Sequence, residues 1–187
     1  MWNTPNLLTL LRIFLIPVFV VVFYLETPWA PYAAAATFGT AALTDLLDGY
    51  LARRWGQTSP LGAFLDPVAD KLMVAVALVL LVQADARTLL ALPAIVIIGR
   101  EITVSALREW MAEIGARAAV AVSAVGKYKT TAQMISICLL VLRDTLLGPF
   151  VYPLGLVLLY AAAVLTLWSM VIYLRAAWPS LSGRVGT

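Results

Sequence analysis

Long apolar stretches dominate this chain and constrain its fold more than any other feature. Six of them come close to the roughly 20 residues that an α-helix needs to cross the hydrocarbon core of a bilayer. The predicted spans are Leu7–Leu25, Ala30–Tyr50, Leu65–Val82, Leu89–Leu107, Ala118–Leu142 and Val151–Leu174. The sequence therefore predicts an all-α integral membrane bundle of six transmembrane helices, with residues 1–187 forming a single domain.

The composition agrees with a membrane location and excludes several kinds of chemistry. Of the 187 residues, 63% are hydrophobic and 12% are charged, whereas a soluble domain has about 25% charged residues. The chain contains no histidine, which excludes Ser-His-Asp triads and histidine-ligated metal centres. The single cysteine, Cys138, can form no disulfide within the chain. The net charge of +3 is interpreted as an arginine bias at the cytoplasmic surface, so no nucleic-acid partner is expected.

Basic residues near the span ends indicate the orientation in the membrane. Arginines flank the connections after the second and fourth spans and follow the sixth span, namely Arg53, Arg54, Arg108, Arg117, Arg175 and Arg184. On the opposite side, Arg87 and Arg143 each have an aspartate close by in the sequence. The positive-inside rule therefore places both termini, and the connections after the second and fourth spans, in the cytoplasm.

Four of the aspartates gather in one short segment. Asp45 and Asp48 are three residues apart, and Asp66 and Asp70 are four apart, so each pair shares one face of a helix. The first pair ends the second span and the second pair begins the third. We expect a loop of about a dozen residues to fold the two helices antiparallel. The two pairs would then face each other at one depth in the membrane.

These four carboxylates would repel one another and be poorly solvated, and cations are the obvious remedy. Hard divalent ions prefer carboxylate oxygens, and two such ions commonly serve phosphoryl chemistry, so we expect two Mg²⁺ or Mn²⁺ ions here. Gly49 and Gly62 lie within one turn of an aspartate, where a missing side chain lets a phosphate or nucleotide approach the backbone. The competing interpretation is a set of interfacial carboxylates paired with Arg53, Arg54 and Lys71.

The same segment resembles the complete signature of the CDP-alcohol phosphatidyltransferase family, in the form Asp45-x2-Asp48-Gly49-x2-Ala52-Arg53-x8-Gly62-x3-Asp66-x3-Asp70. Members of that family are six-helix membrane enzymes, usually homodimers, that displace CMP from a CDP-linked lipid or alcohol with a second alcohol. The resemblance implies that the first three aspartates hold the metal ions. It further implies that Asp70 completes the metal site and acts as the base on the incoming hydroxyl. It places Gly49, Ala52, Arg53 and Gly62 in the CDP pocket.

The remaining charges inside the spans bear on the second substrate. Most of them are basic, which suggests an acceptor that brings its own phosphate, because a neutral or zwitterionic acceptor would need fewer cations. They are Arg12, Arg100, Glu101, Lys127 and Lys129, with Arg108 near a cytoplasmic helix end. Two points stay open. Arg100 could pair with its neighbour Glu101, and the two lysines cannot both point the same way on a straight helix.

Further segments are similar to the branch of the family whose acceptor is sn-glycerol 3-phosphate, namely Pro5–Arg12, Gly99–Glu101, Ser105–Trp110 and Gly126–Gln133. The resemblance implies a reaction in which CDP-diacylglycerol and sn-glycerol 3-phosphate give phosphatidylglycerophosphate and CMP. The residues assigned to the acceptor phosphate are Arg100, Arg108, Lys127 and Lys129. Those assigned to the wall beside the CDP headgroup are Asn6, Thr9 and Arg12.

Two alternative functions would use the four aspartates in different ways. A sibling transferase would use the same metal site with inositol, serine or phosphatidylglycerol as the acceptor. A divalent-cation transporter would use the four aspartates as its transport site. The transporter is disfavoured because the carboxylates collect on one side of the membrane, and because Gly49, Ala52, Arg53 and Gly62 would have no role in it.

Overall fold

The chain forms an all-α bundle, as the apolar stretches predict. The computed structural model describes residues 4–55, 60–85, 88–115 and 124–181, and within these ranges there is no β-strand. A 3₁₀ turn, η2 (Leu142–Asp144), precedes the last helix. The six helices are α1 (Thr4–Phe23), α2 (Ala30–Trp55), α3 (Pro60–Ala84), α4 (Thr88–Glu113), α5 (Ala124–Val141) and α6 (Gly148–Leu181).

The connection between α2 and α3 is shorter than the sequence analysis predicted. Because α2 continues to Trp55 and α3 begins at Pro60, only positions 56–59 separate them. The prediction of a loop of about a dozen residues is therefore wrong. Helix α2 extends beyond the predicted apolar span because its last turns contain leucine, alanine and arginine, which favour a helix outside the membrane as well. Proline at position 60 suits the start of α3, since the first helical residue needs no backbone N–H donor.

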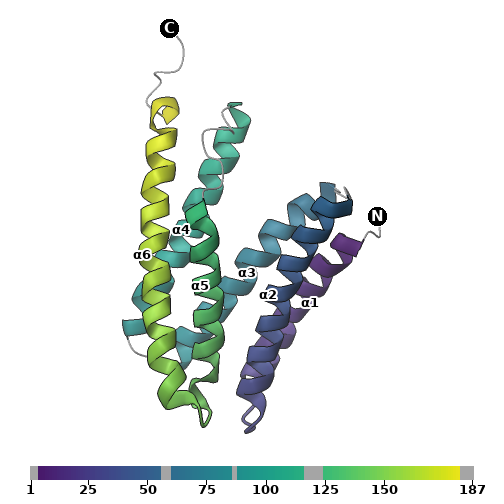
Figure 1. Ribbon diagram of the computed structural model, residues 1–187, viewed down its shortest axis with the longest axis vertical. Coiled ribbons are helices and arrows are strands. Elements are labelled where there is room, and N and C mark those ends of the chain that lie inside the picture. Colours follow the sequence, from purple (N-terminus) through teal and green to yellow (C-terminus); the bar gives the residue numbers. More distant parts are fainter. Residues whose placement is uncertain (1–3, 56–59, 86–87, 116–123, 182–187) are drawn as a thin grey trace.

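The helices fall into two groups that diverge toward one end of the molecule (Figure 1). In one group α1 packs against both α2 and α3, and in the other α6 packs against both α4 and α5. The groups meet where α2 and α3 contact α5 and where α3 contacts α4. The first described residues of α1 and the last of α6 lie at the same, divergent end. That end also holds the last turns of α2 and the first turns of α3.

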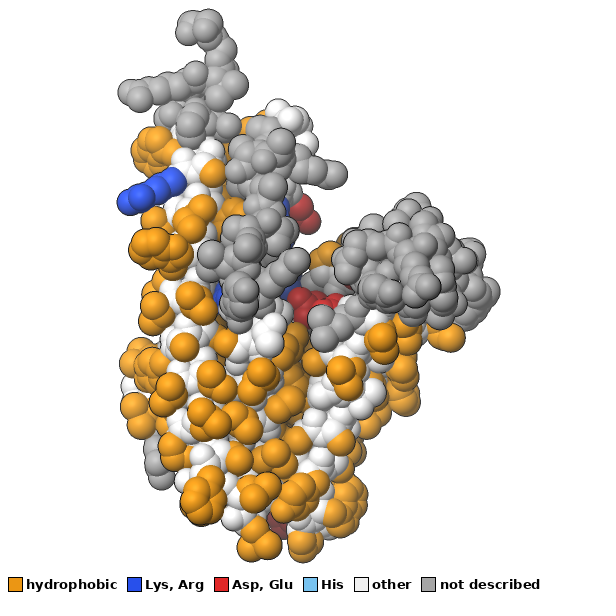
Figure 2. Space-filling view, viewed as in Figure 1, with side chains coloured by type: hydrophobic (Ala, Val, Ile, Leu, Met, Phe, Trp, Pro, Cys, Tyr) orange, Lys and Arg blue, Asp and Glu red, His pale blue; other side chains and the backbone are white. Residues whose placement is uncertain are grey.

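Large apolar side chains cover much of the outer surface, as Figure 2 shows in orange. Phe14, Ile95 and Phe150 are 63%, 68% and 80% exposed, which would be costly in water and suits contact with lipid. By length and composition, α4 and the segment Gly148–Trp178 of α6 could cross a membrane, and α1 contains a shorter apolar stretch, Leu7–Phe23. The described exterior therefore agrees with a membrane bundle.

Close packing of α5 against α6 depends on small residues. The Ser136 hydroxyl on α5 donates a hydrogen bond of 2.7 Å to the Gly155 carbonyl on α6. A Cβ atom at Gly155 would lie 2.9 Å from Cγ of Leu140, which is fully buried. Small residues that let two backbones approach are typical of helix pairs in membranes. This contact fixes the position of α6, which carries part of the candidate site.

Candidate active site

Three of the predicted aspartates come from two neighbouring helices. Asp45 lies on α2, and Asp66 and Asp70 lie one turn apart on α3. All three are partly buried. The Asp70 carboxylate is within electrostatic reach of Asp45 on the other helix. The structure therefore brings carboxylates of both predicted pairs into one region.

Helix α1 holds two of these carboxylates through a pair of buried polar residues. Thr9 donates its hydroxyl hydrogen to the carboxylate of Asp66. Nη1 of Arg12 lies 2.8 Å from a carboxylate oxygen of Asp45. Thr9 and Arg12 are each only 1% exposed, so the positive charge of Arg12 needs a partner. Both residues were predicted to line the CDP pocket, and the structure gives them direct contact with predicted metal ligands.

The donor chemistry of this region suits a hard divalent cation. Carboxylate oxygens are the ligands that Mg²⁺ and Mn²⁺ prefer, and Asp45, Asp66 and Asp70 supply them from two helices. Among the described side chains, however, no three acidic groups converge on one point as they do in a formed metal centre. The side chain of Asp48, the fourth predicted ligand, lies outside the description.

A second charged cluster lies on α4 and α5. Glu101 accepts hydrogen bonds at a single carboxylate oxygen from Arg100 at 2.7 Å and from Lys129 at 2.6 Å. Arg100 is 6% exposed and Lys129 is 3% exposed, so one partly buried carboxylate holds two buried cations. The pairing of Arg100 with Glu101, which the sequence left open, is thus present in the structure.

Helix α6 contributes two residues that the sequence analysis missed. Ser169 accepts a hydrogen bond of 3.2 Å from Nη2 of Arg100. The ring of Tyr173 lies beside the guanidinium groups of both Arg100 and Arg108. A signal for these residues existed, since Thr166, Ser169 and Tyr173 recur at helical spacing within an apolar segment and are all buried. A buried polar face on a membrane helix points to the interior of the bundle.

The acidic and basic clusters lie next to each other. Glu101 on α4 is within electrostatic reach of Asp70 on α3, and Lys129 on α5 is also within reach of Asp70. In Figure 2 the surface is hollowed between the two helix groups, and acidic side chains, in red, lie at the floor of that hollow. The arrangement sets predicted metal ligands beside cations that could bind a phosphate.

Several predicted site residues are only partly placed. Gly62 is buried in the first turns of α3, one turn before Asp66. Arg108 is exposed on α4. The remaining predicted residues belong to described helices but have side-chain positions outside the description, namely Asn6, Asp48, Gly49, Ala52, Arg53 and Lys127. Their roles stay predictions.

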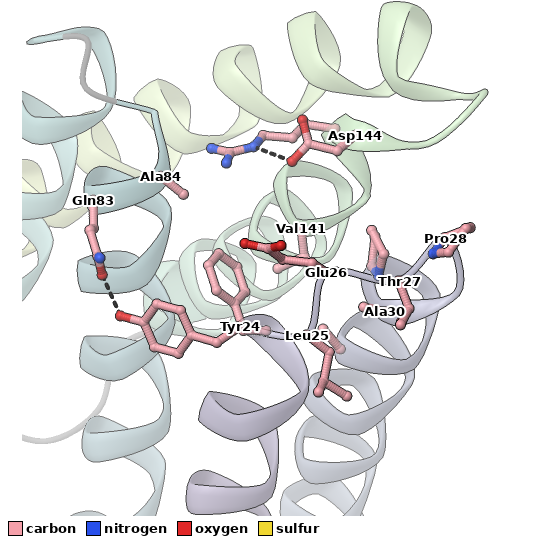
Figure 3. A pocket seen from close by; sticks show the side chains of 14 residues that line it. Tyr24, Leu25, Glu26, Thr27, Pro28, Ala30, Gln83, Ala84, Val141 and Asp144 are labelled. Atoms are coloured by element: carbon pink, nitrogen blue, oxygen red, sulfur yellow. Dashed lines mark hydrogen bonds and ion pairs between the residues drawn. The ribbon is translucent and has the colours of Figure 1, made fainter.

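A separate pocket lies at the other end of the bundle (Figure 3). It has a volume of about 650 Å³ and is lined by the end of α1, the start of α2, the end of α3 and the residues around η2. Its polar groups include Tyr24, which donates a hydrogen bond of 2.5 Å to Gln83, and Arg143, which contacts Asp144 at 3.0 Å. None of the predicted site residues lines it. The clusters around Asp70 therefore remain the candidate active site.

In this all-α membrane bundle, carboxylates from two helices lie near buried cations. Such a site suits a phosphoryl-transfer enzyme, which agrees with the motif. The chain belongs to the CDP-alcohol phosphatidyltransferase family, since the model of that family matches residues 2–168. The family resemblance predicted from the motif is therefore confirmed, and the match extends well beyond the motif itself.

Individual relatives are similar over nearly their whole length. Proteins from Shigella flexneri serotype 5b and from Escherichia coli K12 are each 55% identical to this chain over 176 residues, which cover 94% of the chain and 95% of the relative. A protein from Shigella boydii serotype 4 has the same identity and coverage. All three are named CDP-diacylglycerol–glycerol-3-phosphate 3-phosphatidyltransferase.

Proposed function

We propose that this chain transfers the phosphatidyl group of CDP-diacylglycerol to sn-glycerol 3-phosphate, giving phosphatidylglycerophosphate and CMP. The observation that carries the proposal is the 55% identity, over 94% of the chain, to relatives named for this reaction. The geometry agrees with it, because Asp70 is within electrostatic reach of the cations Arg12 and Lys129. A carboxylate base and cationic groups for a phosphate are two of the features that the reaction requires.

The aspartates serve the pyrophosphate and the proton transfer in this proposal. Mg²⁺ or Mn²⁺, held by Asp45, Asp48, Asp66 and Asp70, would neutralise charge on the pyrophosphate. Asp70 takes the proton from the acceptor hydroxyl. The acceptor oxygen forms a bond to the phosphorus that carries diacylglycerol, and the bond from that phosphorus to the CMP oxygen breaks. Gly49, Ala52, Arg53 and Gly62, together with Asn6, form the walls around the CDP group.

The basic cluster selects an acceptor with a phosphate of its own. Arg100 and Lys129 are buried, and Lys129 is within electrostatic reach of Asp70, so a phosphate bound there would bring the glycerol hydroxyl toward the base. Such positioning converts an encounter of two substrates into a reaction within one complex. Arg108 and Lys127 extend the cationic surface for the same phosphate.

The membrane arrangement follows from the reaction and from the arginine bias. We propose that all six helices cross the bacterial inner membrane, that both termini lie in the cytoplasm and that two copies form a homodimer. The divergent end of the bundle, with the aspartates, would then face the cytoplasm, where a water-soluble glycerol phosphate can enter. The acyl chains of the lipid substrate would stay in the bilayer.

Purified protein supplied with CDP-diacylglycerol, Mg²⁺ and radiolabelled glycerol 3-phosphate tests this function. We expect CMP release that depends on glycerol 3-phosphate and is not matched by inositol, serine or phosphatidylglycerol. Equal release with one of those acceptors would identify a sibling transferase, and metal flux into liposomes without the CDP-lipid would identify a transporter.

A pair of aspartate variants sharpens the same assay. Asp70→Asn removes the proposed base, and we expect it to lower the rate of CMP release by at least about 100-fold, the range for loss of a general base. The matched control is Asp144→Asn at the opposite end of the bundle, where the side chain is 70% exposed and contacts Arg143. This control should keep the wild-type rate. Equal rates for the two variants would contradict the role of Asp70.

A further inference from the structure

Tyr173 on α6 stands out among the buried residues near the site. Its side chain is only 4% exposed, and it packs in a small apolar cluster with Val104, Leu107 and Met111 of α4 and with Ala177. Its neighbours in this cluster are apolar, so packing alone does not require a polar group here. The polar aromatic ring therefore calls for a reason beyond packing.

The ring contacts two arginines that come from different turns of α4. The guanidinium carbon of Arg100 lies 5.8 Å from the ring centroid, and that of Arg108 lies 5.3 Å from it. Both distances fall within the range in which an aromatic face attracts a cation. The Tyr173 hydroxyl also accepts a hydrogen bond of 3.4 Å from Nη2 of Arg108. One side chain thus connects two cations that are eight residues apart in the sequence.

An aromatic ring holds a cation differently from a carboxylate. Glu101 binds Arg100 and Lys129 with a full negative charge, which offsets part of their attraction for a phosphate. The ring of Tyr173 attracts cations through its quadrupole and carries no net charge. It can therefore attract two like charges without neutralising either of them.

We propose that Tyr173 is a positioning residue for the acceptor, which holds Arg100 and Arg108 at the spacing that binds the phosphate of glycerol 3-phosphate. This inference rests on the proposed function. Ser169, one turn earlier on α6, restrains Arg100 from the same helix. Through these two residues α6 determines the geometry of the phosphate site without touching the substrate.

The test measures KM for each substrate separately in Tyr173 variants. Tyr173→Leu should raise KM for glycerol 3-phosphate by about 3- to 30-fold, the range expected from losing a cation–π contact. KM for CDP-diacylglycerol should change by less than about twofold. Tyr173→Phe keeps the ring and loses only the long hydrogen bond, so its KM for glycerol 3-phosphate should stay within about twofold of the wild-type value. The matched control is Tyr160→Leu, on the same helix but 37% exposed, which should change neither KM.

A series of fluorinated phenylalanines at position 173 separates positioning from packing. Each added fluorine weakens the attraction of the ring face for cations and leaves the shape nearly unchanged. We expect KM for glycerol 3-phosphate to rise stepwise along the series while the unfolding temperature stays constant. A constant KM along the series, or equal increases in KM for both substrates, would overturn the inference. If the wild-type chain released no CMP with glycerol 3-phosphate, the proposed function would fail first and this inference would fall with it.

Discussion

At the scale of single residues, the candidate site is organised by buried side chains that orient the charged ones. Thr9 and Arg12 are three residues apart on α1, so they share a face, yet they contact aspartates on two different helices. A buried charge without a partner is costly, and the pairing of Arg12 with Asp45 avoids that cost. The orientation of Asp45 and Asp66 therefore depends on α1, outside the signature motif.

Replacement of Thr9 by valine tests this dependence. Thr9→Val keeps the shape of the side chain and removes the hydroxyl that donates to Asp66. Loss of a hydrogen bond to a charged group costs about 1.5–3 kcal/mol. We expect the rate of CMP release to fall about tenfold, and half-maximal activity to require more Mg²⁺.

Thr37→Val provides the matched control for this variant. The Thr37 hydroxyl donates a hydrogen bond of 2.8 Å to the Ala33 carbonyl within α2. Its activity and its Mg²⁺ requirement should equal those of the wild type. A Thr9→Val protein with the same Mg²⁺ requirement as Thr37→Val would show that α1 does not orient the aspartates.

At the scale of elements, the second helix group depends on how closely α5 and α6 approach. Lys129 is on α5, whereas Ser169 and Tyr173 are on α6, so the basic cluster requires these helices in register with α4. The hydrogen bond from Ser136 to the Gly155 carbonyl sets that register near the middle of α5. Gly155 allows it because no Cβ atom separates the two helices.

We expect Gly155→Ala to destabilise the bundle. The added Cβ would lie 2.9 Å from Cγ of the buried Leu140, and overpacking of this kind costs about 1–3 kcal/mol. Alanine gains up to about 1 kcal/mol of helix propensity over glycine, which offsets only part of the cost. The unfolding temperature in detergent should therefore fall. Gly39→Ala on α2 is the control, since nothing lies within 4 Å of its added Cβ, and it should keep or raise that temperature.

At the scale of the whole molecule, the two helix groups diverge toward the end that holds both described chain ends, and acidic side chains lie in the hollow between them. Two helix groups that meet at one end and separate at the other leave room for a headgroup between them at the separated end. The orientation of the bundle in the membrane therefore decides which compartment supplies the acceptor. The arginine bias predicts that this compartment is the cytoplasm.

Single cysteines at the two ends of α6 test the orientation. Leu146 precedes α6 and is 93% exposed, and Arg175 is exposed near its other end. At 1.5 Å per helical residue the two positions are about 40 Å apart, close to the full thickness of a bilayer. With Cys138 replaced by alanine, a membrane-impermeant maleimide should label Leu146→Cys in intact spheroplasts. It should label Arg175→Cys only after the membrane is opened, and the reverse pattern would contradict cytoplasmic termini.

The sequence by itself determined the features that depend on short-range spacing. Six apolar stretches predicted six helices because a bilayer requires a fixed length of apolar helix, and the spacing of Asp45 through Asp70 led to the family because a helix has a fixed period. The predicted length of the α2–α3 connection was wrong, because a helix can continue beyond the membrane and the end of its apolar span does not mark the end of the helix.

Only the tertiary structure decided which residues meet across helices. The contacts of Thr9 with Asp66, of Glu101 with Lys129 and of Tyr173 with two arginines join residues that are 57, 28 and at least 65 positions apart. No periodicity links such distant positions. Their contacts depend on how each helix rotates and crosses its neighbours, and side-chain packing over the whole bundle sets those angles. The residues of the site can therefore be read largely from the sequence, but the way in which they hold one another cannot.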